Sequence, residues 1–159
     1  MYFCYSKSKT SVPSGTFPFS SWRIIITAVT GQTITLPCGA PENRTVIVVE
    51  WSRTDLGSDY VLRYRDEQFQ TELQHPSFKD RVDLQDRQMK DGDVSLVLKN
   101  VTINDTGTYE CRVVQRGERE RKLIRIIYLE VSPPGELCQS SSSVFTGMEK
   151  SFRHLSPQM

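Results

Sequence analysis

The sequence predicts an all-β protein, a Greek-key sandwich of two antiparallel sheets. From Ile24 onward, short runs rich in Val, Ile, Thr and Tyr alternate with turn residues, and no run has the period of a helix. Two cysteines, Cys38 and Cys111, stand far apart in the chain. Trp51 follows soon after the first cysteine, and Tyr109 lies just before the second. These spacings together favour two facing sheets around one core.

The core residues of each strand follow from period-two alternation once the cysteines set the register. In chain order, the residues expected to point inward are Ile34, Leu36 and Cys38, then Ile47, Val49 and Trp51, then Val82 and Leu84, then Leu96 and Leu98, and then Tyr109, Cys111 and Val113. The last strand adds Leu123, Ile127, Leu129 and Val131. Arg125 falls on the same face of that strand, so a β-bulge or a register shift is predicted beside it.

The motif that leads into the second cysteine makes the prediction more specific. Asp105-Thr106-Gly107-Thr108-Tyr109-Glu110-Cys111, with Cys38 and Trp51 upstream, resembles the immunoglobulin arrangement. An additional apolar run from Tyr60 to Tyr64 favours the variable-type sandwich over the shorter constant type. The stretch from Gly31 to Val131 therefore resembles an immunoglobulin variable-type domain.

This resemblance implies structural roles for the residues that carry it. A disulfide between Cys38 and Cys111 would join the two sheets, and Trp51 would pack against the sulfurs. The hydroxyl of Tyr109 would bond to the backbone just upstream as a tyrosine corner. Because disulfides persist in oxidising compartments, an exported protein is expected.

Five further residues have predicted structural or modification roles. The resemblance implies a salt bridge between Arg81 and Asp105 at the bottom of the domain. Three sequons place glycosylation sites at Asn43, Asn100 and Asn104. Asn43 is the strongest candidate for a glycan, and Asn104 is the weakest because it adjoins a tight turn.

Three segments relate the chain to a group of cell-surface proteins. Residues 48–53, Val-Val-Glu-Trp-Ser-Arg, residues 82–84, Val-Asp-Leu, and residues 105–111 are similar to segments of the butyrophilin, myelin-oligodendrocyte-glycoprotein and costimulatory-ligand group. The coxsackievirus and adenovirus receptor group is also similar. The last strand lacks the Phe-Gly-x-Gly motif of antigen receptors, which argues against an antibody or T-cell receptor chain. The resemblance implies a type I membrane glycoprotein whose outer domain binds another surface protein.

Composition and motifs exclude several function classes. The 159 residues carry a net charge of +1 with both signs interspersed, so bulk charge predicts no nucleic-acid or anionic-membrane partner. The only histidines are His75 and His154, and neither lies near a nucleophile elbow, metal-ligand spacing or glycine-rich phosphate loop. We therefore expect no enzyme, no cofactor, no metal and no small-molecule substrate.

The chain divides into three predicted parts. Residues 1–22 are a disordered or atypical leader, residues 23–132 form the variable-type domain, and residues 133–159 form a flexible Ser/Pro-rich tail. The leader has no apolar core of the secretory type, and no run reaches the roughly 18 apolar residues of a membrane helix. The disulfide nevertheless requires export, so we expect an incomplete or atypical product located outside the plasma membrane or secreted. Cys4 and Cys138 lie outside the sandwich.

One face of the predicted sandwich is the candidate binding surface. Its outward positions are expected to be Val46, Val48, Glu50, Arg112, Val114 and Tyr64. Apolar groups interleaved with charge on an outer face favour contact with another protein. The neighbouring hairpin from Gln115 to Lys122 carries alternating charges and is expected to be solvated, with an acidic or glycan partner as the alternative.

The leading functional hypothesis is a cell-surface recognition domain that binds another protein and regulates lymphocyte signalling, including T-cell signalling. The first alternative is a homophilic adhesion module that pairs with a second copy of itself through the same face. The second alternative is a soluble decoy without a membrane anchor.

Overall fold

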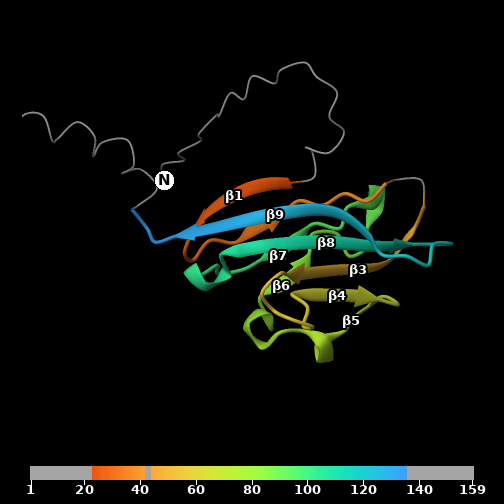
Figure 1. Ribbon diagram of the computed structural model, residues 1–159, viewed down its shortest axis with the longest axis horizontal. Coiled ribbons are helices and arrows are strands. Elements are labelled where there is room, and N and C mark those ends of the chain that lie inside the picture. The colour runs from red at the N-terminus through yellow and green to blue at the C-terminus, as the bar shows by residue number, and fades with distance from the viewer. Residues whose placement is uncertain (1–22, 42–43, 136–159) are drawn as a thin grey trace, which may run out of the picture.

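The computed structural model describes residues 23–41 and 44–135 as two β-sheets packed face to face (Figure 1). The six-stranded sheet has the order β1-β9-β8-β3-β4-β5, and the three-stranded sheet has the order β2-β7-β6. The predicted all-β sandwich of two sheets is therefore confirmed. The predicted leader, Cys4, Asn43, Cys138 and all of the predicted tail from residue 136 lie outside the described residues.

The strands of the larger sheet are, in spatial order, β1 (Arg23–Val29), β9 (Lys122–Ser132), β8 (Gly107–Gln115), β3 (Val46–Arg53), β4 (Leu62–Arg65) and β5 (Gln68–Phe69). Those of the smaller sheet are β2 (Ile34–Leu36), β7 (Leu96–Leu98) and β6 (Val82–Leu84). Short 3₁₀ helices lie in the connections: η1 (Thr71–Leu73), η2 (Pro76–Phe78), η3 (Lys90–Gly92) and η4 (Ile103–Asp105). Only β1 with β9 is a parallel pair among these strands; the other pairs are antiparallel.

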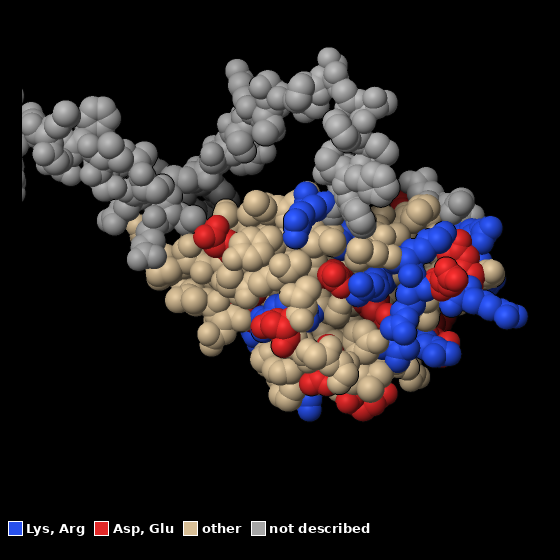
Figure 2. All heavy atoms as spheres, in the orientation of Figure 1, with Lys and Arg blue, Asp and Glu red and all other residues tan. Residues whose placement is uncertain are grey.

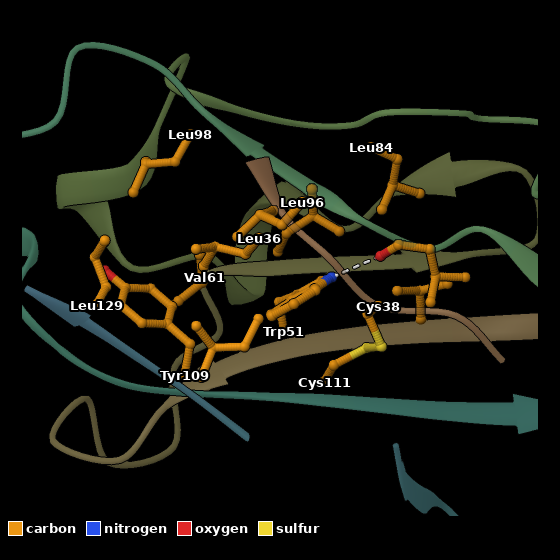
Figure 3. Packing of buried hydrophobic residues seen from close by; sticks show 14 of the residues in the cluster. Leu36, Cys38, Trp51, Val61, Leu84, Leu96, Leu98, Tyr109, Cys111 and Leu129 are labelled. Carbon is orange, nitrogen blue, oxygen red and sulfur yellow. Dashed lines mark hydrogen bonds between the residues drawn. A yellow bond between two sulfur atoms is a disulfide. The ribbon is translucent and has the colours of Figure 1, made fainter. Parts of the chain in front are cut away.

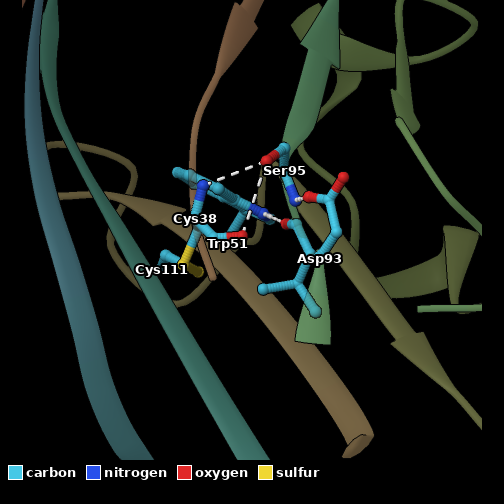
Figure 4. The surroundings of a disulfide bond; sticks show 6 residues. Cys38, Trp51, Asp93, Ser95 and Cys111 are labelled. Atoms are coloured by element: carbon cyan, nitrogen blue, oxygen red, sulfur yellow. Dashed lines mark hydrogen bonds between the residues drawn. A yellow bond between two sulfur atoms is a disulfide. The ribbon is translucent and has the colours of Figure 1, made fainter. Parts of the chain in front are cut away.

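The centre of the core is the disulfide between Cys38 and Cys111, with Trp51 beside it (Figure 3). The indole Nε1 of Trp51 donates a hydrogen bond to the carbonyl oxygen of Val94 at 2.9 Å. The backbone N–H of Cys38 donates to the hydroxyl of Ser95 at 3.1 Å (Figure 4). The Trp51 bond crosses the sandwich, whereas the Cys38 bond lies beside the paired strands β2 and β7 of the smaller sheet. These buried polar groups around the sulfurs therefore have partners, as burial requires.

Tyr109 fixes the turn that leads into β8. Its hydroxyl donates to the backbone carbonyl of Asp105 at 2.6 Å, which is the arrangement of a tyrosine corner. Its ring is fully buried and lies edge-on to the ring of Phe78, with centroids 6.4 Å apart. The side chain thus links the start of β8 to the core.

Stability should fall steeply above pH 10 because Tyr109 is buried. Burial raises the pKa of Tyr109 to about 12, from 10.0 for a free tyrosine. Below pH 10 both states keep the proton and stability is full. As the pH rises, the unfolded state ionises first, so about 2 kcal/mol of unfolding free energy is lost by pH 12. Urea unfolding between pH 8 and 12 measures this loss, and Tyr109→Phe should lack it. Parallel losses in both proteins would contradict the assignment.

The start of β3 departs from the predicted alternation. A register shift between Val46 and Val48 places Val46 opposite Gln115, in the core. Ile47, predicted to point inward, is 39% exposed. The predictions that Val46 points outward and Ile47 inward are both wrong. A β-bulge adds one residue to the strand, so each residue before the bulge points to the opposite face.

The bulge predicted near Arg125 is present in β9. The pairing with β8 shifts between Cys111 and Arg112, opposite Arg125 and Leu123. Leu123 pairs with Arg112 and is only partly buried, so its predicted place in the core is wrong. Ile124 packs against the core in its place. The extra residue thus moves Leu123 to the outer face.

Gly92 should tolerate no side chain. It has φ +76°, and a Cβ there would lie 2.4 Å from the carbonyl oxygen of Ala40. We expect Gly92→Ala to lower the free energy of unfolding by about 2 to 3 kcal/mol in urea titrations. Gly57→Ala is the matched control, because Gly57 has φ +66° and no atom within 4 Å of the added Cβ. It should lose only about 1 kcal/mol. Equal losses would mean that the contact with Ala40 is not the cause.

Candidate protein-binding face

The candidate site is the face of the larger sheet that points away from the smaller sheet, here called the outer face. Cross-strand pairing defines it: Glu50 on β3 lies between Arg112 on β8 and Arg63 on β4. One step along the strands, Val48 lies between Val114 and Arg65 in the same way. The outer face continues through Leu123, Ile126 and Tyr128 on β9 to Ile25 on β1.

Four of the six residues predicted for this face do lie on it. They are Val48, Glu50, Arg112 and Val114. Arg112 and Val114 are partly exposed, whereas Val48 and Glu50 are buried beneath their neighbours. The expectation that Val48 and Glu50 are surface contacts is therefore wrong, because both are buried between the strands on either side of β3.

The other two predicted residues, Val46 and Tyr64, point into the core. The bulge in β3 turns Val46 inward. Tyr64 pairs directly with Val49, and paired residues share a face, so its side chain also points inward. The ring of Tyr64 packs edge-on against Phe69, with centroids 5.0 Å apart. Neither residue is available to a partner in this structure.

Glu50 is the centre of a polar cluster on the outer face. Arg63 donates from Nε to Oε1 of Glu50 at 3.0 Å, and Arg121 donates from Nη1 to Oε2 at 3.3 Å. Arg63 also donates to Gln70 at 2.7 Å, and its guanidinium lies 5.6 Å from the ring centroid of Tyr60. These charge-assisted bonds compensate for the burial of the carboxylate.

In this cluster the negative group is buried and a positive group is exposed to solvent. The Glu50 side chain is 5% exposed, whereas that of Arg121 is 60% exposed. The nearby Glu50 carboxylate raises the pKa of Arg121 above its ordinary value, so the guanidinium stays charged. The cluster therefore contains a carboxylate underneath and presents a cation to solvent.

Two neighbouring ion pairs also bury the carboxylate more deeply than the cation. Arg112 bonds Glu110 at 2.6 Å and Lys122 bonds Glu118 at 2.6 Å, and in each pair the cation is the more exposed partner. The pair of Arg65 with Asp66 at the edge of the sheet is the reverse. Figure 2 shows Lys and Arg side chains gathered where β8 leads into β9 and where β4 ends. This end of the outer face is cationic.

The other end of the outer face is apolar. Ile25 and Tyr128 lie side by side on β1 and β9 and are 71% and 39% exposed. Figure 2 shows mainly uncharged surface over this end of the sheet. Neither Ile25 nor Tyr128 was predicted for this face, because they come together only through the pairing of β1 with β9. The run of isoleucines from Ile24 to Ile26 was the available signal.

The other residues predicted from the sequence are the salt-bridge pair and the asparagines of the sequons. Arg81 forms an ion pair with Asp105, whose side chain is 3% exposed. Asp105 also accepts a hydrogen bond from the backbone N–H of Thr102 at 2.8 Å. Asn100 and Asn104 are exposed, and their occupancy by glycan remains a prediction.

Two kinds of feature are absent from residues 23–41 and 44–135. No group of three or more His, Cys, Asp or Glu side chains there is placed to hold a metal ion. The same residues include no helix with the length and apolar character needed to span a membrane.

Known proteins are similar to this chain in sequence and in fold. The immunoglobulin V-set domain model matches residues 25–131. Butyrophilin subfamily 1 member A1 of Homo sapiens is 29% identical over 131 residues, covering 75% of this chain and 25% of that protein. Junctional adhesion molecule B of Mus musculus is 28% identical over 125 residues, covering 77% of this chain and 37% of that protein.

Among solved structures, that of bovine butyrophilin superposes with a TM-score of 0.57 and 25% identity, covering 72% of this chain and 56% of that chain. These matches confirm the resemblance to the butyrophilin and costimulatory-ligand group. The chain spans only a part of its curated relatives, 25% of the human butyrophilin and 37% of the mouse adhesion molecule. The chain belongs to the immunoglobulin V-set family.

Proposed function

We propose that this chain is a recognition domain, outside the plasma membrane or secreted, which binds another protein through the outer face and regulates lymphocyte signalling. The observation that carries the proposal is the composition of that face. It combines exposed arginines with Tyr128 and Ile25 on a rigid sheet. Arginine and tyrosine are enriched at the energetic centres of protein interfaces. The similarity to butyrophilins supports the same role.

A homophilic adhesion role is the second candidate, and the similarity to junctional adhesion molecule B favours it. A symmetric dimer would place the same patch of each copy against the other. On the outer face, a two-fold axis near Arg121 would bring exposed cations together, which is unfavourable. The charge distribution therefore supports a different protein as the partner.

A binding screen of the full chain against displayed ectodomains tests the proposed function. Arg112→Glu and Val114→Asp alter partly exposed positions on the outer face, and each should abolish binding to the captured partner. Lys99→Glu is the control, because Lys99 is an exposed cation beside β7 in the smaller sheet. Binding that is lost with Lys99→Glu but retained in both outer-face variants would refute the proposed site.

Light scattering on the same proteins separates the two candidates. We expect the wild-type chain to be monomeric at concentrations at which it binds its partner. Strong self-association that disappears with Arg112→Glu would favour the adhesion module.

A further inference from the structure

We propose that the partner presents a carboxylate side chain that binds between Arg63 and Arg121, above Glu50. This inference rests on the proposed function, since it specifies the chemistry of the partner for the same face. The site is formed by β3, β4 and the beginning of the segment that becomes β9.

The hydrogen bonds around Glu50 leave part of each guanidinium available. Arg63 uses Nε for Glu50 and Nη1 for Gln70. Arg121 uses Nη1 for both Glu50 and the hydroxyl of Tyr60, at 3.3 and 3.4 Å. In the described part of the chain, Nη2 of Arg63 and both Nε and Nη2 of Arg121 make no hydrogen bond. Guanidinium groups of this kind bind carboxylates through paired N–H donors.

The charges of the cluster do not cancel. Two guanidiniums share one carboxylate, so Glu50, Arg63 and Arg121 together carry one excess positive charge. Glu50 lies beneath the arginines and is shielded from a ligand that approaches from solvent. Its hydrogen bonds also hold the two guanidiniums in place. Because these side chains are already ordered, they lose less conformational entropy when a ligand binds.

The surroundings favour a protein carboxylate over a sulfated glycan. Sulfated chains bind through extended rows of cations, whereas the neighbouring cations Arg112 and Lys122 are each paired with a carboxylate. The cluster is also bordered on the outer face by Val114 and Leu123, and it includes the ring of Tyr60. A polar centre with an adjacent aromatic and aliphatic surface is the composition of a protein interface. An acidic side chain flanked by apolar ones is therefore the occupant that this face fits.

An NMR titration of the ¹⁵N-labelled full chain tests the inference directly. Three probes are compared: a peptide of alternating acidic and apolar residues, the same peptide with Glu and Asp replaced by Gln and Asn, and a heparin-derived oligosaccharide. We expect saturable shifts of the Nε–H signals of Arg63 and Arg121 with the acidic peptide alone. Arg121→Gln should weaken this binding about tenfold. Because Arg121 is mostly exposed, the variant should stay folded, which the rest of its spectrum will show.

Arg87→Gln is the matched control. Arg87 is also an exposed arginine paired with a carboxylate, that of Asp83, but it lies outside the outer face. Its replacement should leave the titration unchanged. The inference is overturned by unshifted Arg63 and Arg121 signals at millimolar acidic peptide, by equal response to the neutral peptide, or by preferred binding of the oligosaccharide. A screened partner that is lost with Arg112→Glu but unaffected by Arg121→Gln would overturn this inference and leave the proposed function standing.

Discussion

Replacing Cys38 and Cys111 together with alanine should lower the free energy of unfolding by about 4 kcal/mol. The disulfide joins residues 73 positions apart, so it removes much of the chain entropy of the unfolded state. Small domains have only about 5 to 15 kcal/mol of stability in total, so the loss is a large share. Urea unfolding monitored by the fluorescence of Trp51 and Trp22 measures the change.

Reduction of the wild-type protein provides the control for this variant. If the bond itself is responsible, the wild type in excess dithiothreitol should unfold at nearly the urea concentration of the double alanine variant. The single variant Cys38→Ala should match both, because either change removes the same bond. A double variant within about 1 kcal/mol of the oxidised wild type would contradict the role of the disulfide.

Arg81→Ala should cost about 3 kcal/mol of unfolding free energy. The variant leaves the carboxylate of Asp105 buried without its cation, which is the costly way to break a buried ion pair. It also removes the hydrogen bond that Arg81 Nη1 donates to the carbonyl of Ser77 at 2.7 Å. Chemical denaturation at neutral pH measures the effect.

Arg87→Ala is the comparison for this second effect. The guanidinium of Arg87 lies 2.8 Å from the carboxylate of Asp83, but the side chains of this pair are 63% and 27% exposed. An exposed pair contributes about 0 to 1 kcal/mol, so the variant should be nearly as stable as the wild type. Similar losses for Arg81→Ala and Arg87→Ala would show that burial of Asp105 is not decisive.

Local spacing was sufficient to predict the centre of the fold. The residues around Cys38, Trp51 and Tyr109 lie in strands or next to them as the period-two pattern required, and all three side chains are buried. Even the bulge beside Arg125 was predicted, because this charged residue falls among the apolar residues of the face that points to the core. Such features are visible in sequence because the alternation within each strand shows which of its own residues share a face.

Errors arose where one extra residue changes the register. Nothing in the residues from Val46 to Val48 distinguishes a regular strand from a bulged one, since all three are β-branched and apolar. The bulge exchanged the predicted places of Val46 and Ile47. Leu123 was misplaced for the same reason, although the bulge itself was predicted.

The sequence by itself determined that this chain forms a two-sheet sandwich, which residues lie around its disulfide, and which sheet carries the candidate site. Only the tertiary structure decided the character of that site. Glu50 meets Arg63 and Arg121, and Ile25 meets Tyr128, through pairing of strands that are distant in the chain. The physical reason is that a strand's own alternation shows which residues share a face, whereas its neighbours in the sheet decide which of them are covered and which charges reach the solvent.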